Sequence, residues 1–462
     1  MAEIKAKPGE RVLATSRTTT PGGTCTDCHV DTFTVHIFFD GTGNNRFNTA
    51  SHRENPKTSP KGSVSYENYY SNIALLFMAM QEFDDVKKIY IQGSGTEKGK
   101  KDDSLGLGLA RSSTGRLERV EQAINELNMI VGDIDRGNVI LNVYGFSRGA
   151  AWARHFCWLL KNFSYKRWSK CKINFVGIFD TVSSDTIEHY NDVKQLGLDI
   201  GRPQKINYIA HLTAQNDYRE HFPLTPIHGA IKDGIGFECS FPGAHSDIGG
   251  GYSEIAKEEN RFLGFVDDKL NINSNTSLKE EWIDTSWFMR KGYYRPMQIS
   301  TKVHRFGAKG GRNTDAKLNK NARYSPVVAD AYFANRTIKF HYQLIPCSIM
   351  YEIAKRKANF SLKKGTYFEK HLKEMKNISL LKKFHDTALT YVLANYKKNT
   401  GGHKVPFLAE AEMKVIFNEY IHSSLTYGDI ANKGTLRSKT KNADGSLNYA
   451  QPIRPKVTQG FR

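Results

Sequence analysis

The sequence lacks a long apolar run. Its longest uninterrupted apolar stretch, residues 73–80, has eight members, whereas a helix needs about 20 to cross a bilayer. The first residues, MAEIKAKPGERVLATSR, contain no apolar segment of the kind that a Sec signal peptide carries. We therefore expect no membrane-spanning helix, and we expect any export to use a machine that reads no cleavable signal.

Cysteine is scarce as well. Six cysteines in 462 residues are too few for a disulfide-stapled fold. Cys25 and Cys28 form the only C-x-x-C, which His29 follows. No second pair stands at metal-binding spacing, so we favour incidental thiols in a flexible lead over a zinc site. The Gly-rich connection over residues 93–115 lacks the G-x-x-x-x-G-K-[ST] spacing of a nucleotide-binding loop, and we expect an active-site loop or lid there instead.

Acidic residues are depleted in one part of the chain only. The formal net charge is +19, but residues 1–300 hold 36 basic and 36 acidic side chains, while residues 301–462 hold 30 and 11. A basic last third suits nucleic acid, an anionic membrane surface or an acidic partner protein. Charge by itself leaves these three classes of partner open.

The sequence does contain a strand, a turn and a helix with a serine at the turn. Residues 138–144, NVILNVY, suit a strand buried on both faces of a parallel sheet. The run RGAAWARHFCWLLKNF that follows favours a helix. Between them stands GFSRG, in which Gly145 and Gly149 flank Ser147, the G-x-S-x-G of a nucleophile elbow. A serine that only caps the helix is the alternative, but the flanking strand and helix favour a nucleophile.

A carboxylate and an imidazole follow in the order that a serine hydrolase needs. The strand pattern over residues 172–182, KINFVGIFDTV, ends in Asp180, and a strand at residues 236–241 opens onto a Gly-rich turn that holds His245. An imidazole would take the proton of Ser147, and a carboxylate would hold that imidazole in the right tautomer. His245 as an ordinary surface histidine is the alternative reading. Asp247 is a rival acid, which we assign to shaping the turn.

A second loop is a candidate for binding the oxyanion. A strand over residues 34–39 runs into the sequence DGTGNN, which places backbone amides at the carboxyl end of a strand. We expect one oxyanion donor from the amide of Gly41 or Thr42 and the other from the amide of Arg148. The alternative is a tight turn in which Asp40 only bonds the backbone.

These elements predict an α/β fold of the α/β-hydrolase type, with a mainly parallel central sheet flanked by helices and a partly helical C-terminal elaboration. We expect a flexible lead over residues 1–30, a catalytic core over residues 31–255 and a basic, partly helical region over residues 256–462. That last region is a candidate for docking on a membrane or a partner. The chemistry needs neither a metal nor an organic cofactor.

Four blocks in the chain, FFDGTGN, GFSRGAA, FDTV and FPGAHSDIGGGY, together resemble the α/β-hydrolase family that includes the family-1 lipase effectors of bacterial type VI secretion. The resemblance covers residues 34–252 and implies Ser147, Asp180 and His245 as the catalytic triad. It implies phospholipase A activity on membrane glycerophospholipids, a spike or tube protein of the secretion apparatus as partner, and a cognate immunity protein. It also implies synthesis in a bacterial cytoplasm and delivery into the periplasm of a competing cell.

We therefore predict a lipid hydrolase that cleaves acyl esters of bacterial membrane phospholipids as an antibacterial type VI effector, with nucleic acid not expected as a partner. Two alternatives stay open at this point. One is a soluble carboxylesterase that acts on small esters. The other is a basic protein that binds nucleic acid or another anionic partner and carries a relic hydrolase site.

Overall fold

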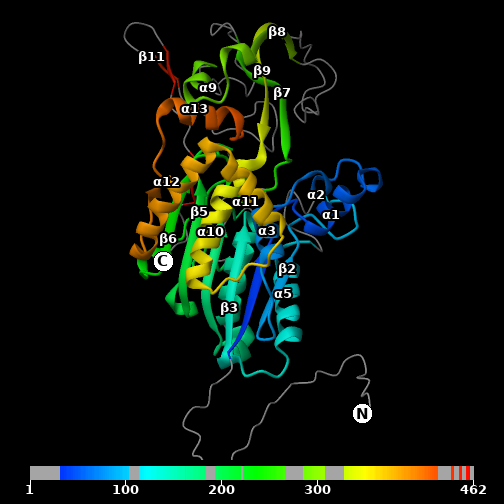
Figure 1. Ribbon diagram of the computed structural model, residues 1–462, viewed down its shortest axis with the longest axis vertical. Coiled ribbons are helices and arrows are strands. Elements are labelled where there is room, and N and C mark those ends of the chain that lie inside the picture. The colour runs from blue at the N-terminus through cyan, green and yellow to red at the C-terminus, as the bar shows by residue number, and fades with distance from the viewer. Residues whose placement is uncertain are drawn as a thin grey trace, which may run out of the picture. The chain divides into compact units, whose positions relative to one another are not determined.

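A parallel sheet forms the centre of the computed structural model (Figure 1). The structure describes residues 32–103, 114–161, 163–183, 193–194, 196–219, 222–265, 285–306, 327–424, 439–441, 447–449 and 454–457. Within them the sheet has seven strands in the order β10-β6-β5-β4-β3-β1-β2, and every neighbouring pair is parallel. The strands are β1 (Phe33–Phe39), β2 (Val86–Ile91), β3 (Val139–Phe146), β4 (Lys172–Phe179), β5 (Ile206–Ala214), β6 (Gly236–Phe241) and β10 (His403–Lys404).

The strand order contains a point where the chain reverses its direction of travel across the sheet. From β1 the chain moves outward to β2, returns to place β3 on the other side of β1, and then continues through β4 and β5 to β6. In open α/β sheets ligands bind outside the carboxyl ends of the strands at such a reversal. The loop after β1 and the turn after β3 therefore mark the expected position of a functional site.

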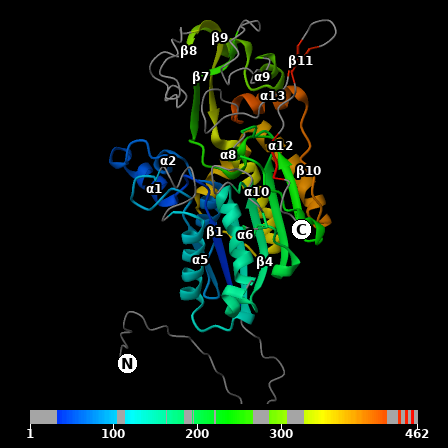
Figure 2. The same ribbon diagram turned by 180° about the vertical axis from the view of Figure 1, so that it is seen from behind.

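Helices cover both faces of this sheet because its strands are apolar on both sides. In β1, Val35, Ile37 and Phe39 face one cluster of buried side chains, while Phe38 faces the other. The first cluster is covered by α5 (Arg116–Val131) and α6 (Arg148–Lys161), which Figure 2 shows in front of the sheet. The opposite face, toward the viewer in Figure 1, is covered by α3 (Asn72–Ala79), α10 (Leu344–Lys357), α11 (Tyr367–Asn377) and α12 (Ser379–Asn395).

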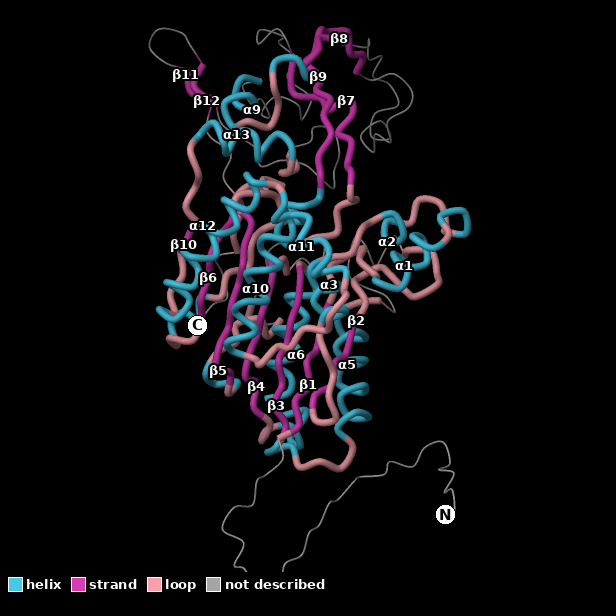
Figure 3. The backbone as a smooth tube through the Cα atoms, in the orientation of Figure 1, coloured by secondary structure: helices cyan, strands magenta, loops and turns pink. Residues whose placement is uncertain are grey.

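The remaining elements surround this core (Figure 3). The other helices are α1 (Arg46–Glu54), α2 (Val64–Glu67), α7 (His228–Lys232), α8 (His245–Gly249), α9 (Thr285–Lys291) and α13 (Glu410–Glu419). Short 3-10 helices occupy Pro56–Thr58, Arg136–Asn138, Phe163–Trp168, Arg202–Gln204, Pro296–Gln298, Phe340–Gln343 and Tyr396–Lys398. A three-stranded antiparallel sheet has the order β7-β9-β8, from β7 (Ile255–Phe265), β8 (Ile299–Phe306) and β9 (Val327–Lys339), and β11 (Lys439–Lys441) pairs with β12 (Leu447–Tyr449).

The fold class predicted from the sequence is confirmed. Helix α3 starts at the cap that Ser71 provides and ends at Met80, which pairs with Leu362. The basic C-terminal region contains α11 and α12 as two separate helices, since Ile378 between them has extended backbone angles.

Elements beyond residue 255 contribute to the central layers. Strand β10 joins β6 at the edge of the sheet, and α10 packs on β4 and β5. The division of the chain at residue 255 stays a prediction. Within the described residues no helix is long and apolar enough to cross a membrane. Cys25, Cys28 and the expected lead over residues 1–30 lie outside the described part of the chain.

Candidate active site

Ser147 occupies a strained turn between β3 and α6. Its φ angle is +59°, in the left-handed region that side chains rarely adopt. Four backbone hydrogen bonds hold it there: its amide donates to the carbonyl of Phe179 at 3.1 Å, and its carbonyl accepts from Ala150 at 3.1 Å and from Ala151 and Val182 at 3.3 Å each. The hydroxyl therefore stands at the carboxyl edge of the sheet, beside the point where the strand order reverses.

The two glycines of the motif are required by close approaches of backbone. A Cβ added at Gly145 would lie 2.6 Å from the Cα of Ala150 in the first turn of α6. A Cβ added at Gly149 would lie 2.2 Å from the carbonyl oxygen of Asp40 in the loop after β1. The two glycines thus let α6 start immediately after Ser147 and pack closely against the loop that follows β1.

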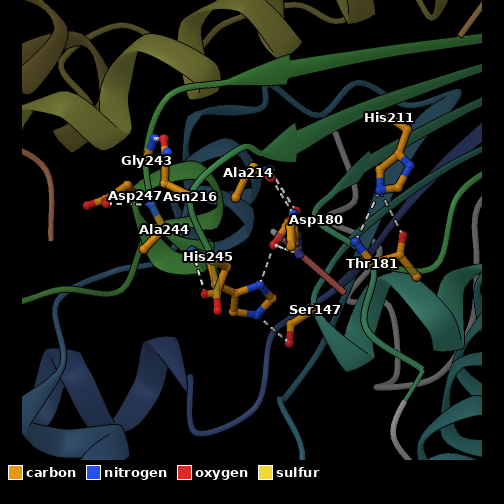
Figure 4. Close-up of polar contacts among 12 residues, drawn as sticks. Ser147, Asp180, Thr181, His211, Ala214, Asn216, Gly243, Ala244, His245 and Asp247 are labelled. Atoms are coloured by element: carbon orange, nitrogen blue, oxygen red, sulfur yellow. Dashed lines mark hydrogen bonds and ion pairs between the residues drawn. The ribbon is translucent and has the colours of Figure 1, made fainter. Parts of the chain in front are cut away.

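The structure brings the three residues expected to react into one hydrogen-bonded chain (Figure 4). Asp180 follows β4, and His245 follows β6 as the first residue of α8. Nδ1 of His245 lies 2.6 Å from Oδ2 of Asp180, and Nε2 lies 2.7 Å from Oγ of Ser147. An ionised carboxylate only accepts, so Nδ1 donates to Asp180 and Nε2 is left to accept from the serine hydroxyl. This is the arrangement of a nucleophile, its base and the group that orients the base.

Burial and neighbouring charges set the protonation states of Asp180 and His245. Ser147 is 3% exposed, His245 4% and Asp180 0%. Burial alone would raise the pKa of Asp180, but the Arg454 guanidinium and the His245 imidazole hold that pKa well below its usual range. Burial lowers the pKa of His245 below its usual value, although the hydrogen bond and the charge of Asp180 oppose this shift. At neutral pH the site therefore combines an ionised carboxylate with a neutral imidazole that is able to accept a proton.

The turn that carries His245 is fastened by two further carboxylates. Asp217, which follows β5, accepts the backbone amide of His245 at 3.0 Å and pairs with Arg219 at 2.6 Å. Asp247 accepts the amide of Ala244 at 2.8 Å and pairs through its other oxygen with Nδ1 of His422 at 2.8 Å. Asp247 thus shapes the turn, as expected, and does not contact the imidazole of His245 within the described contacts.

A second imidazole supports the turn after Asp180. Nε2 of His211 accepts the backbone amide of Thr181 at 3.1 Å (Figure 4). Its Nδ1 lies 2.9 Å from Oε2 of Glu238. His211 and Thr181 are both 0% exposed. This group therefore holds the backbone of the acid turn and is closed to a substrate.

The loop proposed for the oxyanion is ordered by Asp40. Its carboxylate is fully buried and accepts the amide of Gly41 at 2.7 Å, the hydroxyl of Ser71 at 2.6 Å and the hydroxyl of Tyr90 at 2.6 Å. Burial raises the pKa of Asp40 to about 6, and these hydrogen bonds oppose the shift. Of the two amides expected as alternatives for one oxyanion donor, Gly41 or Thr42, that of Gly41 donates to Asp40.

Thr42 and Arg148 remain as the oxyanion candidates. Among the described residues no acceptor lies against the amide of Thr42, and its hydroxyl accepts from Nε of Arg148 at 2.6 Å. Arg148 opens α6, so its amide stands in the first turn of the helix. The Arg148 side chain thus ties the loop after β1 to the start of α6.

Sequence reasoning missed Asp217, His422 and Arg454. Asp217 had a usable signal, because it stands just beyond the carboxyl end of β5, where parallel strands place functional side chains. His422 and Arg454 lie 175 and 274 residues from the carboxylates they bind, and no local pattern marks them. Within the described residues no group of three or more His, Cys, Asp or Glu side chains is arranged to hold a metal ion.

Comparison with known proteins agrees with this architecture. A family model described as "T6SS, Phospholipase effector Tle1-like, catalytic domain" matches residues 161–279, a range that includes Asp180 and His245. A solved structure described as "Structure of the Tle1 effector bound to the VgrG spike from the Type 6 secretion system" superposes with a TM-score of 0.57 at 21% identity, covering 96% of this chain and 98% of that chain. These findings confirm the resemblance inferred from the four sequence blocks.

A second solved structure, of an uncharacterized protein from Pseudomonas aeruginosa, matches with a TM-score of 0.35 at 19% identity over 48% of this chain and 42% of that chain. This similarity is too low to bear on the fold. No curated protein matches the chain.

Proposed function

We propose that this protein, which is similar to the Tle1-like phospholipase effectors of type VI secretion, is a serine hydrolase that cleaves acyl esters of membrane glycerophospholipids. The observation that carries the proposal is the unbroken chain from Ser147 Oγ through the His245 imidazole to the Asp180 carboxylate. It lies at the carboxyl edge of a parallel sheet, on a strained turn, as the chemistry requires.

The proposed reaction starts at Ser147. Nε2 of His245 takes the hydroxyl proton while Oγ attacks the ester carbonyl, and Asp180 stabilises the imidazolium that forms. The amides of Thr42 and Arg148 bind the oxyanion of the tetrahedral intermediate. His245 then protonates the departing lysolipid oxygen, and an acyl group stays on Ser147. Water, deprotonated by His245, releases the fatty acid and restores the serine.

Aromatic side chains beside the imidazole suit an acyl chain. The ring of Phe146 lies 4.7 Å from the His245 ring between centroids, and the ring of Phe222 lies 5.3 Å from it. Apolar rings next to the reacting atoms favour an ester whose acyl part is a hydrocarbon. The family model that matches the chain is itself one of phospholipase effectors.

The proposal extends to delivery. The similar Tle1 protein is described as bound to a VgrG spike, and we assign a spike or tube protein of a type VI apparatus as the partner of this chain. Synthesis in a bacterial cytoplasm, delivery into the periplasm of a target cell and a cognate immunity protein in the producer complete the proposed role.

A comparison of esters held in vesicles with a dissolved monomeric ester distinguishes a phospholipase from the alternative functions. Fatty-acid release is measured from vesicles of phosphatidylglycerol and phosphatidylethanolamine and compared, at two salt concentrations, with hydrolysis of a water-soluble monomeric ester. The proposal expects faster turnover on vesicles. Equal or faster turnover of the monomeric ester would indicate a soluble carboxylesterase. Salt-sensitive vesicle or nucleic-acid binding without any hydrolysis would indicate a basic binding protein.

A further inference from the structure

The carboxylate of Asp180 has a second partner from the far end of the chain. Arg454 places Nη1 2.5 Å from Oδ1 of Asp180 and Nη2 2.8 Å from Oδ2. Nη1 also donates to the carbonyl of Ala214 at 2.6 Å. Both side chains are buried, with 5% of Arg454 and none of Asp180 exposed. A planar guanidinium that meets both oxygens of a carboxylate fixes the plane of that carboxylate as well as its position.

The segment that carries Arg454 lies beside the turn that follows Asp180. The carbonyl of Pro455 accepts the amide of Leu224 at 2.9 Å, and the amide of Val457 donates to the carbonyl of Leu224 at 2.8 Å. Leu224 in turn pairs with Val182, which follows Asp180 closely in the chain. The Val457 side chain packs in a small apolar cluster with Ala151, Val193 and Leu198. Residues 454–457 therefore lie as a short extended strap against the site.

The other contacts of Asp180 show what Arg454 adds. Oδ1 also accepts the amide of Ala214 at 2.7 Å, and Oδ2 accepts Nδ1 of His245 at 2.6 Å. Without Arg454, each oxygen of Asp180 would keep one hydrogen-bond donor. Of these two donors, only the His245 imidazole is able to carry a positive charge that compensates the buried carboxylate. An uncompensated buried carboxylate is unfavourable and either takes up a proton or recruits one onto a neighbouring base.

We propose that Arg454 is a positioning residue of the active site, which fixes the Asp180 carboxylate against Nδ1 of His245. The inference rests on the proposed function, since it assigns a part to a residue that acts through the Ser147, His245 and Asp180 chain.

The charges around His245 give this inference a pH signature. The groups that face the imidazole are Asp180 with its partner Arg454 and Asp217 with its partner Arg219, and Tyr252 lies near Arg219. Asp180 and Asp217 thus each carry a guanidinium, while Asp247 on the same turn is paired with Nδ1 of His422. Removing the charge of Arg454 leaves one net negative charge beside the imidazole, which raises the pKa of His245 and keeps it protonated to higher pH.

The test compares three full-length variants on a monomeric ester and on phospholipid vesicles. Arg454→Met removes both the positive charge and the two N–H groups that contact the Asp180 oxygens. Arg454→Lys keeps the charge but does not contact both oxygens at once. Lys456→Gln is the matched control, because it removes an exposed charge from the same strap. We expect kcat of Arg454→Met to fall on the order of 100-fold with little change in KM, and the acidic limb of its pH profile to move to higher pH. Arg454→Lys should fall between, with its acidic limb unshifted, and Lys456→Gln should match the wild type.

The outcomes separate this inference from the proposed function. An Arg454→Met variant with the turnover and pH profile of Lys456→Gln would overturn the role of Arg454 and leave the serine chemistry standing. A wild type that hydrolyses neither ester would overturn both. Should Arg454→Met fail to fold, Arg454→Lys decides, because a full-rate Arg454→Lys shows that the two-oxygen contact positions nothing. Labelling of Ser147 by a fluorophosphonate, followed by mass spectrometry, gives a second rate for the same variants without a lipid.

Discussion

Gly149 passes so close to Asp40 that the two residues leave no room for a side chain between them. A Cβ at Gly149 would lie 2.2 Å from the carbonyl oxygen of Asp40 and 2.5 Å from that of Phe39. The start of α6 and the loop after β1, which supply the two expected oxyanion donors, therefore hold each other in place. The spacing between the amides of Arg148 and Thr42 depends on this contact.

Gly149→Ala should accordingly damage both stability and catalysis. The added methyl group meets backbone, which does not yield as a flexible side chain does, so we expect a loss of about 1–3 kcal/mol in the free energy of unfolding and a larger relative loss of turnover. Gly137→Ala is the matched control, because its Cβ meets only the Asp135 carboxylate at 3.1 Å. Thermal melting and ester hydrolysis of both variants check this. A Gly149→Ala protein as active as Gly137→Ala would contradict it.

The tie between Arg148 and Thr42 gives a prediction for catalysis alone. Thr42→Val keeps the backbone amide and the side-chain shape but removes the oxygen that accepts from Nε of Arg148 at 2.6 Å. A hydrogen bond from a charged donor is worth about 1.5–3 kcal/mol, so we expect kcat to fall roughly tenfold or more as the loop loosens. The melting temperature serves as the control. Unchanged kcat in a folded Thr42→Val protein would remove this loop from the oxyanion site.

The pH dependence of hydrolysis follows from His245. Its imidazole accepts the serine proton only when neutral, and burial places its pKa below the usual value of about 6.5. Activity is therefore complete above that lowered pKa and is lost as the pH falls through it. The acidic limb of kcat/KM, which reports the free enzyme, should have its midpoint below 6.5. A midpoint clearly above 6.5 would mean that excess negative charge, and not burial, dominates around the imidazole.

The catalytic triad is the part of the site that the sequence predicts. Ser147 and Asp180 follow apolar strands directly and His245 stands on the turn after a third, and parallel strands end at one edge, so the sequence alone predicts their meeting. Asp217, which stands just beyond the end of β5 at Ala214, was not predicted. Gly41 and Thr42 stayed alternatives for one donor because the sequence does not show which way the Asp40 carboxylate turns.

Arg454 marks the limit of such reasoning. It reaches Asp180 across 274 residues of chain, and its neighbours in the sequence have no periodicity that places them beside the sheet. The contact depends on the strap pairing with Leu224, a long-range backbone arrangement that local propensities do not encode. The same holds for Arg336, whose partners come from separate segments of the chain.

Arg336 and Glu258 form a buried ion pair whose loss should be severe. Nε of Arg336 lies 2.7 Å from Oε2 of Glu258, with 0% and 4% of their side chains exposed. Arg336 also donates to the carbonyls of Tyr293, Phe417, Asn418 and Ile421. Among the described residues, Arg336→Met leaves the buried Glu258 carboxylate only its longer ion pair with Arg261, at 3.6 Å, so we expect a loss of about 3–5 kcal/mol in the free energy of unfolding.

A surface pair provides the control for that measurement. Lys382 and Asp386 lie 2.6 Å apart with about half of each side chain exposed, and breaking such a pair costs about 0–1 kcal/mol. Denaturant unfolding of Arg336→Met and Lys382→Met should separate the two values. Equal losses would show that Arg336 does not hold the segment that leads to His422.

The measurement that tests the central claim most directly is fatty-acid release from phosphatidylglycerol and phosphatidylethanolamine vesicles by the wild type and by Ser147→Ala. The claim is that Ser147 is the nucleophile of a phospholipase. It predicts release by the wild type and, in a variant that melts at the wild-type temperature, a loss of several orders of magnitude, about 10³-fold or more. Full release by a folded Ser147→Ala protein would contradict the account.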